Sequence, residues 1–169
     1  MSAKPVVATA SPSRDIQVSS NFERLLFEIN GRDGGLTGEQ LQRFRLRDQL
    51  DLEADQRAEW IEGSFRGASA DDDATIAEIA RIHRETGLLI DPHTATATAA
   101  ARSLDGPHPI VTLATAHPAQ FPDAVERATG VRPHLPAHLA DLLERTERTV
   151  TIPAGLADVE RFVESVGRR

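Results

Sequence analysis

Short apolar runs alternate with amphipathic helical patterns along this chain, and this alternation limits the folds that it can adopt. Runs rich in β-branched and aliphatic residues between turn signals are typical of buried strands. The predicted strands are Val6–Thr9, Leu88–Ile90, Pro109–Ala114 and Thr149–Ile152. Strands that alternate with helices indicate a mainly parallel sheet flanked by helices. The sequence therefore predicts an α/β fold.

Helix signals fill the segments between these runs. The predicted helices are Asn21–Ile29, Thr37 to about Leu50, a short helix with Trp60 and Ile61, Asp71 to Gly87, Thr94–Leu104, Pro122–Thr129, Pro136–Thr146 and Leu156–Val166. Asp91-Pro92 is an N-cap followed by a proline in the first turn, whereas Gly87 and Gly130 are typical helix ends. Thr37 and Gln40 have the spacing of a capping box. The three carboxylates of Asp71 to Asp73 favour a helix start over a metal site, because the helix macrodipole stabilises them there.

The length of 169 residues is that of one ordinary domain. We therefore predict a single α/β unit over residues 1–169, with a helical insertion over residues 31–70.

Composition excludes several classes of function. The net charge is −7 and the arginines are scattered, so no basic stripe for nucleic acid is present. The apolar runs are far shorter than the ~20 residues of a membrane helix. The absence of cysteine excludes disulfides and thiolate metal sites. Pro136 between His134 and His138 argues against a zinc pair, so we expect no metal. We expect a cytoplasmic protein without nucleic-acid or membrane partners.

Three of the predicted strands end in polar loops that lead into helices. These exits are Ser11-Pro12-Ser13, Asp91-Pro92-His93-Thr94 and Thr115-Ala116-His117-Pro118. Parallel strands place their carboxyl ends on one edge of a sheet, where ligands bind, and helix N-termini favour anions. This pattern indicates a site for a polar or anionic ligand. Polar loops are also common after strands, and helix-start histidines often bond only the backbone.

Four blocks of sequence are similar, in order and approximate spacing, to the bacterial and fungal threonine synthases. They are residues 11–26, Gly31-Arg32-Asp33-Gly34, residues 89–95 (Leu-Ile-Asp-Pro-His-Thr-Ala), and residues 113–125 from Leu-Ala-Thr-Ala-His-Pro-Ala to Phe-Pro-Asp-Ala-Val. The resemblance runs from about Pro5 to the C-terminus, and the chain resembles the C-terminal part of these enzymes. It implies a pyridoxal-phosphate enzyme of the tryptophan-synthase-β-like class (fold type II). Such an enzyme converts O-phospho-L-homoserine and water into L-threonine and phosphate.

The resemblance also implies roles for particular residues. Thr115 would bond the pyridine nitrogen of the cofactor, and Asp91, His93 and Thr94 would line the cofactor wall. The substrate side would carry Ser13, Ser19, Ser20, Asn21 and Arg24. Three places depart from the family pattern: Arg14 in place of a methionine, Thr96-Ala97 in place of Val-Gly, and Gln120 in place of a lysine.

The chain has eighteen arginines but a single lysine, Lys4. In the family, the Schiff-base lysine and the phosphate-cradling loop lie N-terminal to the matched stretch, and Lys4 does not match that lysine. We therefore expect no catalytic residue and no stable cofactor binding in this chain alone. Its expected partners are the N-terminal part of the enzyme and O-phosphohomoserine, with possible self-association. The alternative is a stand-alone binding or interaction domain that retains the scaffold without catalysis.

Overall fold

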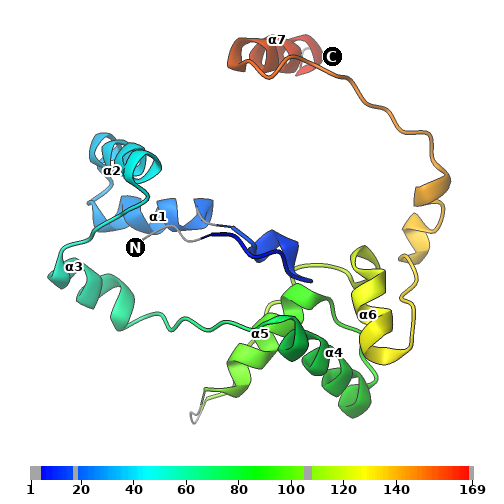
Figure 1. Cartoon of the computed structure of the whole chain (residues 1–169). Coiled ribbons are helices and arrows are strands. Elements are labelled where there is room, and N and C mark those ends of the chain that lie inside the picture. The colour runs from blue at the N-terminus through cyan, green and yellow to red at the C-terminus, as the bar shows by residue number, and fades with distance from the viewer. Residues whose placement is uncertain (1–4, 17–18, 105–107, 168–169) are drawn as a thin grey trace. The chain divides into compact units, whose positions relative to one another are not determined.

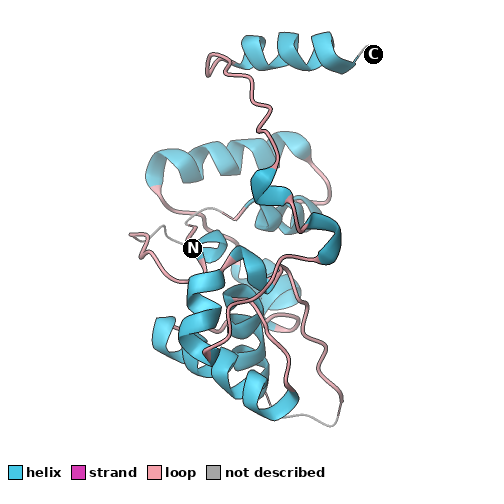
Figure 2. Ribbon diagram, turned by 90° about the vertical axis from the view of Figure 1, so that its right-hand side faces the viewer, coloured by secondary structure: helices cyan, strands magenta, loops and turns pink. Residues whose placement is uncertain are grey.

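The computed structural model describes residues 5–16, 19–104 and 108–167. These ranges consist of helices and loops (Figures 1 and 2). The chain divides into two compact units, Met1–Pro133 and His134–Arg169. The elements of the first unit are η1 (Pro12–Arg14), α1 (Ser20–Ile29), α2 (Gly34–Arg47), α3 (Ala54–Arg57), η2 (Ala58–Glu62), α4 (Asp72–Thr86), α5 (Pro92–Arg102), η3 (Pro118–Gln120) and α6 (Pro122–Thr129). The single α/β unit over residues 1–169 stays a prediction.

The α1 and α2 helices form a small apolar core. Leu26 of α1, Phe44 of α2 and Leu50 after α2 are buried, and Phe22 and Leu41 pack beside them. The sequence pattern explains this packing, because apolar residues recur in α1 at helical spacing. Residues 31–70 contain α2, α3 and the π-helical turn η2 with Trp60, as the sequence predicts. Whether this stretch is an insertion stays a prediction.

The start of α2 differs from the prediction. Asp33, which the sequence indicates only as a turn residue, is the N-cap, and its carboxylate accepts from Leu36 N at 2.9 Å. Thr37 lies inside the helix, where its buried hydroxyl donates to the Asp33 carbonyl at 2.7 Å. The capping-box prediction at Thr37 was therefore wrong. Asp33 is the N-cap because its carboxylate reaches the unpaired N–H groups of the first turn.

The second core lies between α4, α5 and α6, which Figure 1 shows packed together. Ile79, Ala95 and Val125, one from each helix, are fully buried. The predicted ends of α4 and α6 are confirmed, whereas α5 ends at Arg102 and not at Leu104. Asp71 caps α4 by accepting from Ala74 N at 2.8 Å, and Gly87 ends α4 with a φ of 75°. Glycine is favoured there because a side chain is strained in the left-handed region.

The predicted strands are not strands in this structure. Val6–Thr9, Leu88–Ile90, Pro109–Ala114 and Thr149–Ile152 lie in loops, and residues 5–16, 19–104 and 108–167 contain no β-strand. The parallel sheet of the predicted α/β fold is therefore absent from these ranges. The physical reason is that a strand is defined by ladder hydrogen bonds to a neighbouring strand, and local propensity supplies none.

The second unit, His134–Arg169, contains η4 (Ala137–Leu139), η5 (Leu142–Glu144) and α7 (Leu156–Gly167). The prediction for α7 is confirmed, but the predicted helix Pro136–Thr146 is only two short 3-10 turns. Leu143, in the second turn, is 87% exposed. A short helix gains most of its stability from burying an apolar face, and this segment buries little.

Candidate functional site

A buried polar cluster occupies the start of α5. Asp91 is 1% exposed, and its Oδ1 accepts from His93 N at 2.8 Å and from Thr94 N at 3.2 Å. The Thr94 hydroxyl donates to Asp91 Oδ2. Pro92 has no N–H to satisfy, so Asp91-Pro92 is a favourable helix start. These bonds fix the backbone at a predicted cofactor wall.

His93 joins three segments that are far apart in the sequence. Its Nδ1 shares a buried hydrogen bond with Ser11 Oγ, in which either group can donate according to the ring tautomer. The Phe121 ring packs edge-to-face on the imidazole, with centroids 4.8 Å apart and planes at 71°. The structure thus brings together the first two predicted strand exits and Phe121, the residue before α6, around one histidine.

The segment Thr9–Asp15, named here the Ser13 loop, is closed at its base by Asp15. The Asp15 carboxylate accepts from Thr9 N and from the Thr9 hydroxyl, both at 2.7 Å. Ala10 N donates to Asp72 Oδ1 at 2.8 Å, which attaches the loop to the first turn of α4. Ser13 lies exposed in this loop.

Thr115 lies on the wall of an open cavity of about 480 Å³. One side of the cavity is the α5 face with Thr96 and Ala97, and the other consists of loop residues 110–113 and Thr115, with Arg66 and Ala68 also in the lining. The Thr115 hydroxyl has no hydrogen bond to any other residue that the structure describes. His117, in the same strand exit, caps η3 by accepting from Ala119 N at 3.1 Å. Thr115 can therefore bond a ligand, whereas His117 Nδ1 is used by its own turn.

The predicted substrate-side residues on α1 lie together at its start. Ser19 is the N-cap position without a side-chain cap bond, and Ser20, Asn21 and Arg24 are exposed in the first turns. No ion pair or hydrogen bond between described residues connects them to Asp91, Thr94 or Thr115. The roles of the nine predicted site residues stay predictions.

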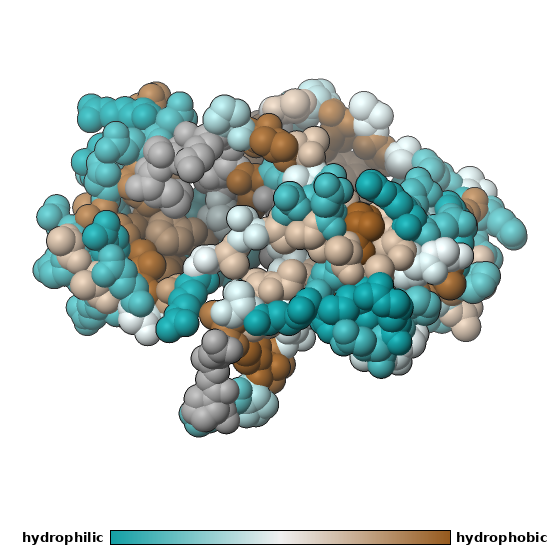
Figure 3. Space-filling model, turned by 60° about the horizontal axis from the view of Figure 1, so that its bottom comes forward, coloured by the Kyte–Doolittle hydropathy of each residue, from teal (hydrophilic) through white to brown (hydrophobic). Residues whose placement is uncertain are grey.

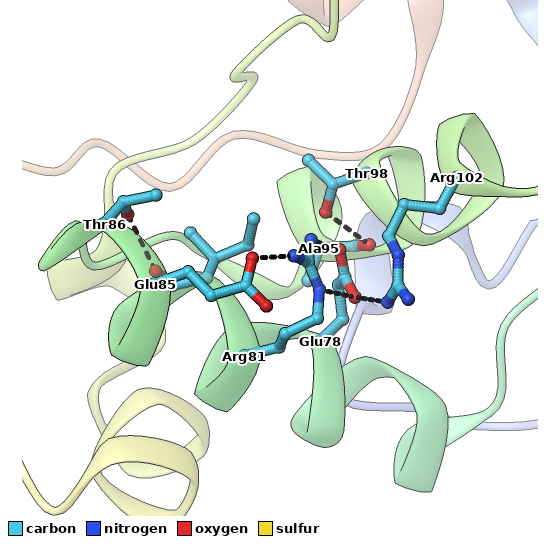
Figure 4. A network of polar contacts seen from close by, with 8 residues as sticks. Glu78, Arg81, Glu85, Thr86, Ala95, Thr98 and Arg102 are labelled. Carbon is cyan, nitrogen blue, oxygen red and sulfur yellow. Dashed lines mark hydrogen bonds and ion pairs between the residues drawn. The ribbon is translucent and has the colours of Figure 1, made fainter.

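A buried carboxylate, Glu78, lies between α4 and the C-terminal end of α5. Arg81 of α4 and Arg102 of α5 converge on it at 2.7 and 2.9 Å (Figure 4). The Arg81 hydrogen bond, assisted by Arg102, lowers the pKa of Glu78 to about 2 although burial opposes the shift. The ion pair between Glu78 and Arg102 thereby connects α4 to α5.

Sequence reasoning did not assign roles to Ser11, Glu78 or Phe121, and it placed Asp72 only in the helix start of α4. Ser11 and Phe121 belong to the matched blocks, so the signal was present there, whereas nothing in the sequence pairs Glu78 with Arg102. Of the departures from the family pattern, Thr96 and Ala97 line the cavity, Gln120 is exposed, and Arg14 ends η1. Lys4 lies outside the described residues.

Two absences within residues 5–16, 19–104 and 108–167 bear on other classes of site. No helix there is both long and apolar enough to cross a bilayer. In the same ranges, no three His, Asp or Glu side chains gather into a possible metal site.

Comparison with known proteins places the chain in a family. The family model described as threonine synthase, C-terminal, matches residues 94–163. The threonine synthase of Pseudomonas aeruginosa is 49% identical over 166 residues, which cover 94% of this chain and 34% of the relative. The threonine synthase of Corynebacterium glutamicum is 35% identical, over 92% of this chain and 33% of the relative. The chain thus spans about a third of the length of these relatives.

Solved structures agree with this placement. A pyridoxal-phosphate-bound threonine synthase from Brucella melitensis is 40% identical, with a TM-score of 0.81 over 99% of this chain and 36% of that structure. The yeast threonine synthase is 26% identical, with a TM-score of 0.73 over 99% of this chain and 38% of that structure.

Proposed function

Because this chain belongs to the threonine synthase family, as its C-terminal region, we propose that it forms part of a pyridoxal-phosphate site. The complete enzyme would convert O-phospho-L-homoserine and water into L-threonine and phosphate in the cytoplasm. The chain spans about a third of its relatives, so an N-terminal region supplies the rest of the site. The Schiff-base lysine belongs to that region, and the chain alone is inactive.

Thr115 is the observation that carries this proposal. It is exposed, its hydroxyl is unbonded among the described residues, and it lines a cavity whose apolar walls include Ile110, Leu113 and Ala100. Such a cavity suits the flat ring of pyridoxal phosphate, and one neutral donor suits the ring nitrogen. The residues present therefore fit the cofactor.

Asp91, His93 and Thr94 would act as a supporting wall and not as direct ligands. The Asp91 carboxylate bonds the α5 backbone and the Thr94 hydroxyl, and His93 Nδ1 bonds Ser11. A ligand that took those bonds would have to break buried contacts, which costs about 1–3 kcal/mol each. We infer that they hold the first turn of α5 rigid beside the cofactor.

The cofactor, when bound, supplies an electron sink for carbanion chemistry. The Thr115 hydroxyl would donate a hydrogen bond to the ring nitrogen and would keep its proton. A neutral donor leaves that nitrogen largely uncharged, whereas a carboxylate there would keep it charged. Thr115 would thereby moderate the strength of the sink.

The start of α1 suits an anionic substrate. Ser19, Ser20 and Asn21 offer small polar groups at a helix N-terminus, and Arg24 has no ion pair to another described residue. Backbone N–H groups and a free guanidinium both favour phosphate. Ser13, which is exposed in the Ser13 loop before α1, would add a further hydroxyl on the substrate side.

Exposed apolar segments support the proposed N-terminal partner. Val7, Val111 and Leu113 are each more than 70% exposed, and all belong to predicted strands. Figure 3 shows apolar atoms open to solvent among hydrophilic ones. We propose that strands of the N-terminal region pair with these segments in a parallel sheet. Residues 1–169 would then form a single α/β unit, in which residues 31–70 are a helical insertion.

The same exposed segments support a second candidate function. A stand-alone interaction domain would use them to bind another protein or a second copy, because large apolar patches drive association. Thr115 would then have no chemical role.

A hybrid enzyme distinguishes these functions. This chain replaces the matching third of the Pseudomonas aeruginosa threonine synthase, and threonine formation from O-phosphohomoserine is measured. The enzyme proposal predicts threonine formation and rescue of a threonine auxotroph, both lost when the chain is omitted. A folded hybrid that binds pyridoxal phosphate but forms no threonine contradicts the proposal and favours the interaction domain.

A further inference from the structure

Ser11 differs from its neighbours in burial. It is 5% exposed, whereas Pro12 and Ser13 beside it are exposed. Burial of a hydroxyl is costly unless it is hydrogen-bonded, and the Ser11 hydroxyl meets His93 Nδ1 in the interior. The bond joins positions 82 residues apart, so it is a tertiary contact and not a local turn.

The Ser13 loop is otherwise closed on itself. Asp15 binds Thr9 at the base, and the Thr9 hydroxyl also accepts from Ser11 N at 3.1 Å. Two hydrogen bonds between described residues attach this closed loop to helices: Ala10 N to Asp72 of α4, and Ser11 to His93 of α5. The loop can therefore move relative to α5 only if the Ser11 bond breaks.

We propose that Ser11 is a positioning residue, whose bond to His93 holds the Ser13 loop at a fixed distance from the α5 wall. This inference rests on the proposed function, in which Ser13 faces the substrate and α5 faces the cofactor. A bond between the Ser13 loop and α5 therefore keeps the substrate and the cofactor aligned. Ser11 itself touches neither.

The test compares three variants in the hybrid enzyme and in this chain. Ser11→Ala removes the hydroxyl, and Ser11→Thr retains it. Ser103→Ala is the matched control, because it deletes a serine hydroxyl bonded to the Ala100 carbonyl at the far end of α5. The rates of amide hydrogen exchange in residues 9–15 are measured in this chain, and KM and kcat in the hybrid.

We expect Ser11→Ala to accelerate exchange in the Ser13 loop and to raise KM for O-phosphohomoserine about tenfold, as loss of one buried hydrogen bond allows. The melting temperature of the Ser11→Ala hybrid should stay within a few degrees of that of the unsubstituted hybrid. Ser11→Thr should restore the loop exchange rate and the KM. Ser103→Ala should leave them unchanged. A purely structural serine would lower stability without a selective rise in KM.

Three results would overturn the inference. They are equal loop exchange in wild type and Ser11→Ala, an unchanged KM, or a Ser11→Thr variant as impaired as Ser11→Ala. If the unsubstituted hybrid forms no threonine, the proposed function fails instead, and the exchange rates alone decide whether Ser11 holds the loop.

Discussion

Glu78 of α4 and Arg102 at the end of α5 form an ion pair of 2.9 Å between positions 24 residues apart. Glu78 is 4% exposed, and the same carboxylate binds Arg81 of its own helix at 2.7 Å. One buried charge thus connects two helices through two guanidinium groups. Because α5 begins with the predicted cofactor wall, this clamp links helix packing to the site.

Replacing Glu78 with glutamine should destabilise the chain by about 1–3 kcal/mol, since both charge-assisted bonds are lost and two arginines are left facing an amide. Glu85→Gln is the matched control, because Glu85 binds the same Arg81 from an exposed position. Its effect should stay below about 1 kcal/mol. Urea unfolding measures both, and equal effects would contradict the clamp.

The Glu78 contribution should depend on pH in the acid range. Its pKa is about 2 in the folded chain against an ordinary value of 4.5. The unfolded chain therefore binds the proton first as pH falls, so stability is fully present above the unfolded value and is lost as pH falls toward 2. The stability gap between wild type and Glu78→Gln should narrow over this window. A gap that is constant down to pH 2 contradicts the lowered pKa.

Thr115→Val in the hybrid enzyme should weaken binding of pyridoxal phosphate by about 1–3 kcal/mol, because the ring nitrogen loses its donor. Thr115→Ser should be much milder, since the hydroxyl survives. Folding should barely change for either, because the side chain is exposed. Absorbance titration with the cofactor measures the affinities, and the site assignment fails if Val and Ser behave alike.

Leu26→Ala should destabilise the α1–α2 core by about 2–5 kcal/mol, because a fully buried leucine leaves a cavity. Leu46→Ala on α2 removes the same atoms from a side chain that is 85% exposed. The control should change stability by less than about 0.5 kcal/mol. Thermal unfolding compares the two, and equal losses would place Leu26 outside the core.

The chain alone should self-associate, because Val111 and Leu113 are 82% and 73% exposed and lie in an unpaired extended segment. Bare strand edges and apolar patches both drive association. Light scattering should show a mass that rises with concentration, and Val111→Thr with Leu113→Thr should reduce it. A monomer at every concentration contradicts this prediction.

Local chemistry explains what could be predicted from the sequence. Asp91-Pro92 begins α5, and Gly87 and Gly130 end α4 and α6, as predicted. A cap acts within one turn of its own residue, so the signal and its effect are close in the chain. Asp33 shows the limit, because it caps α2 although the sequence indicated Thr37 as the cap.

The sequence by itself determined α1, α4, α6 and α7, the caps of α4 and α5, and the blocks that identify the family. Only the tertiary structure decided which distant residues meet: Ser11 with His93, and Glu78 with Arg102. It also decided that Pro109–Ala114 is an extended loop here and not a strand. The physical reason is range, since a cap is satisfied within its own helix, whereas a strand or a buried ion pair requires a partner that folding must bring to it.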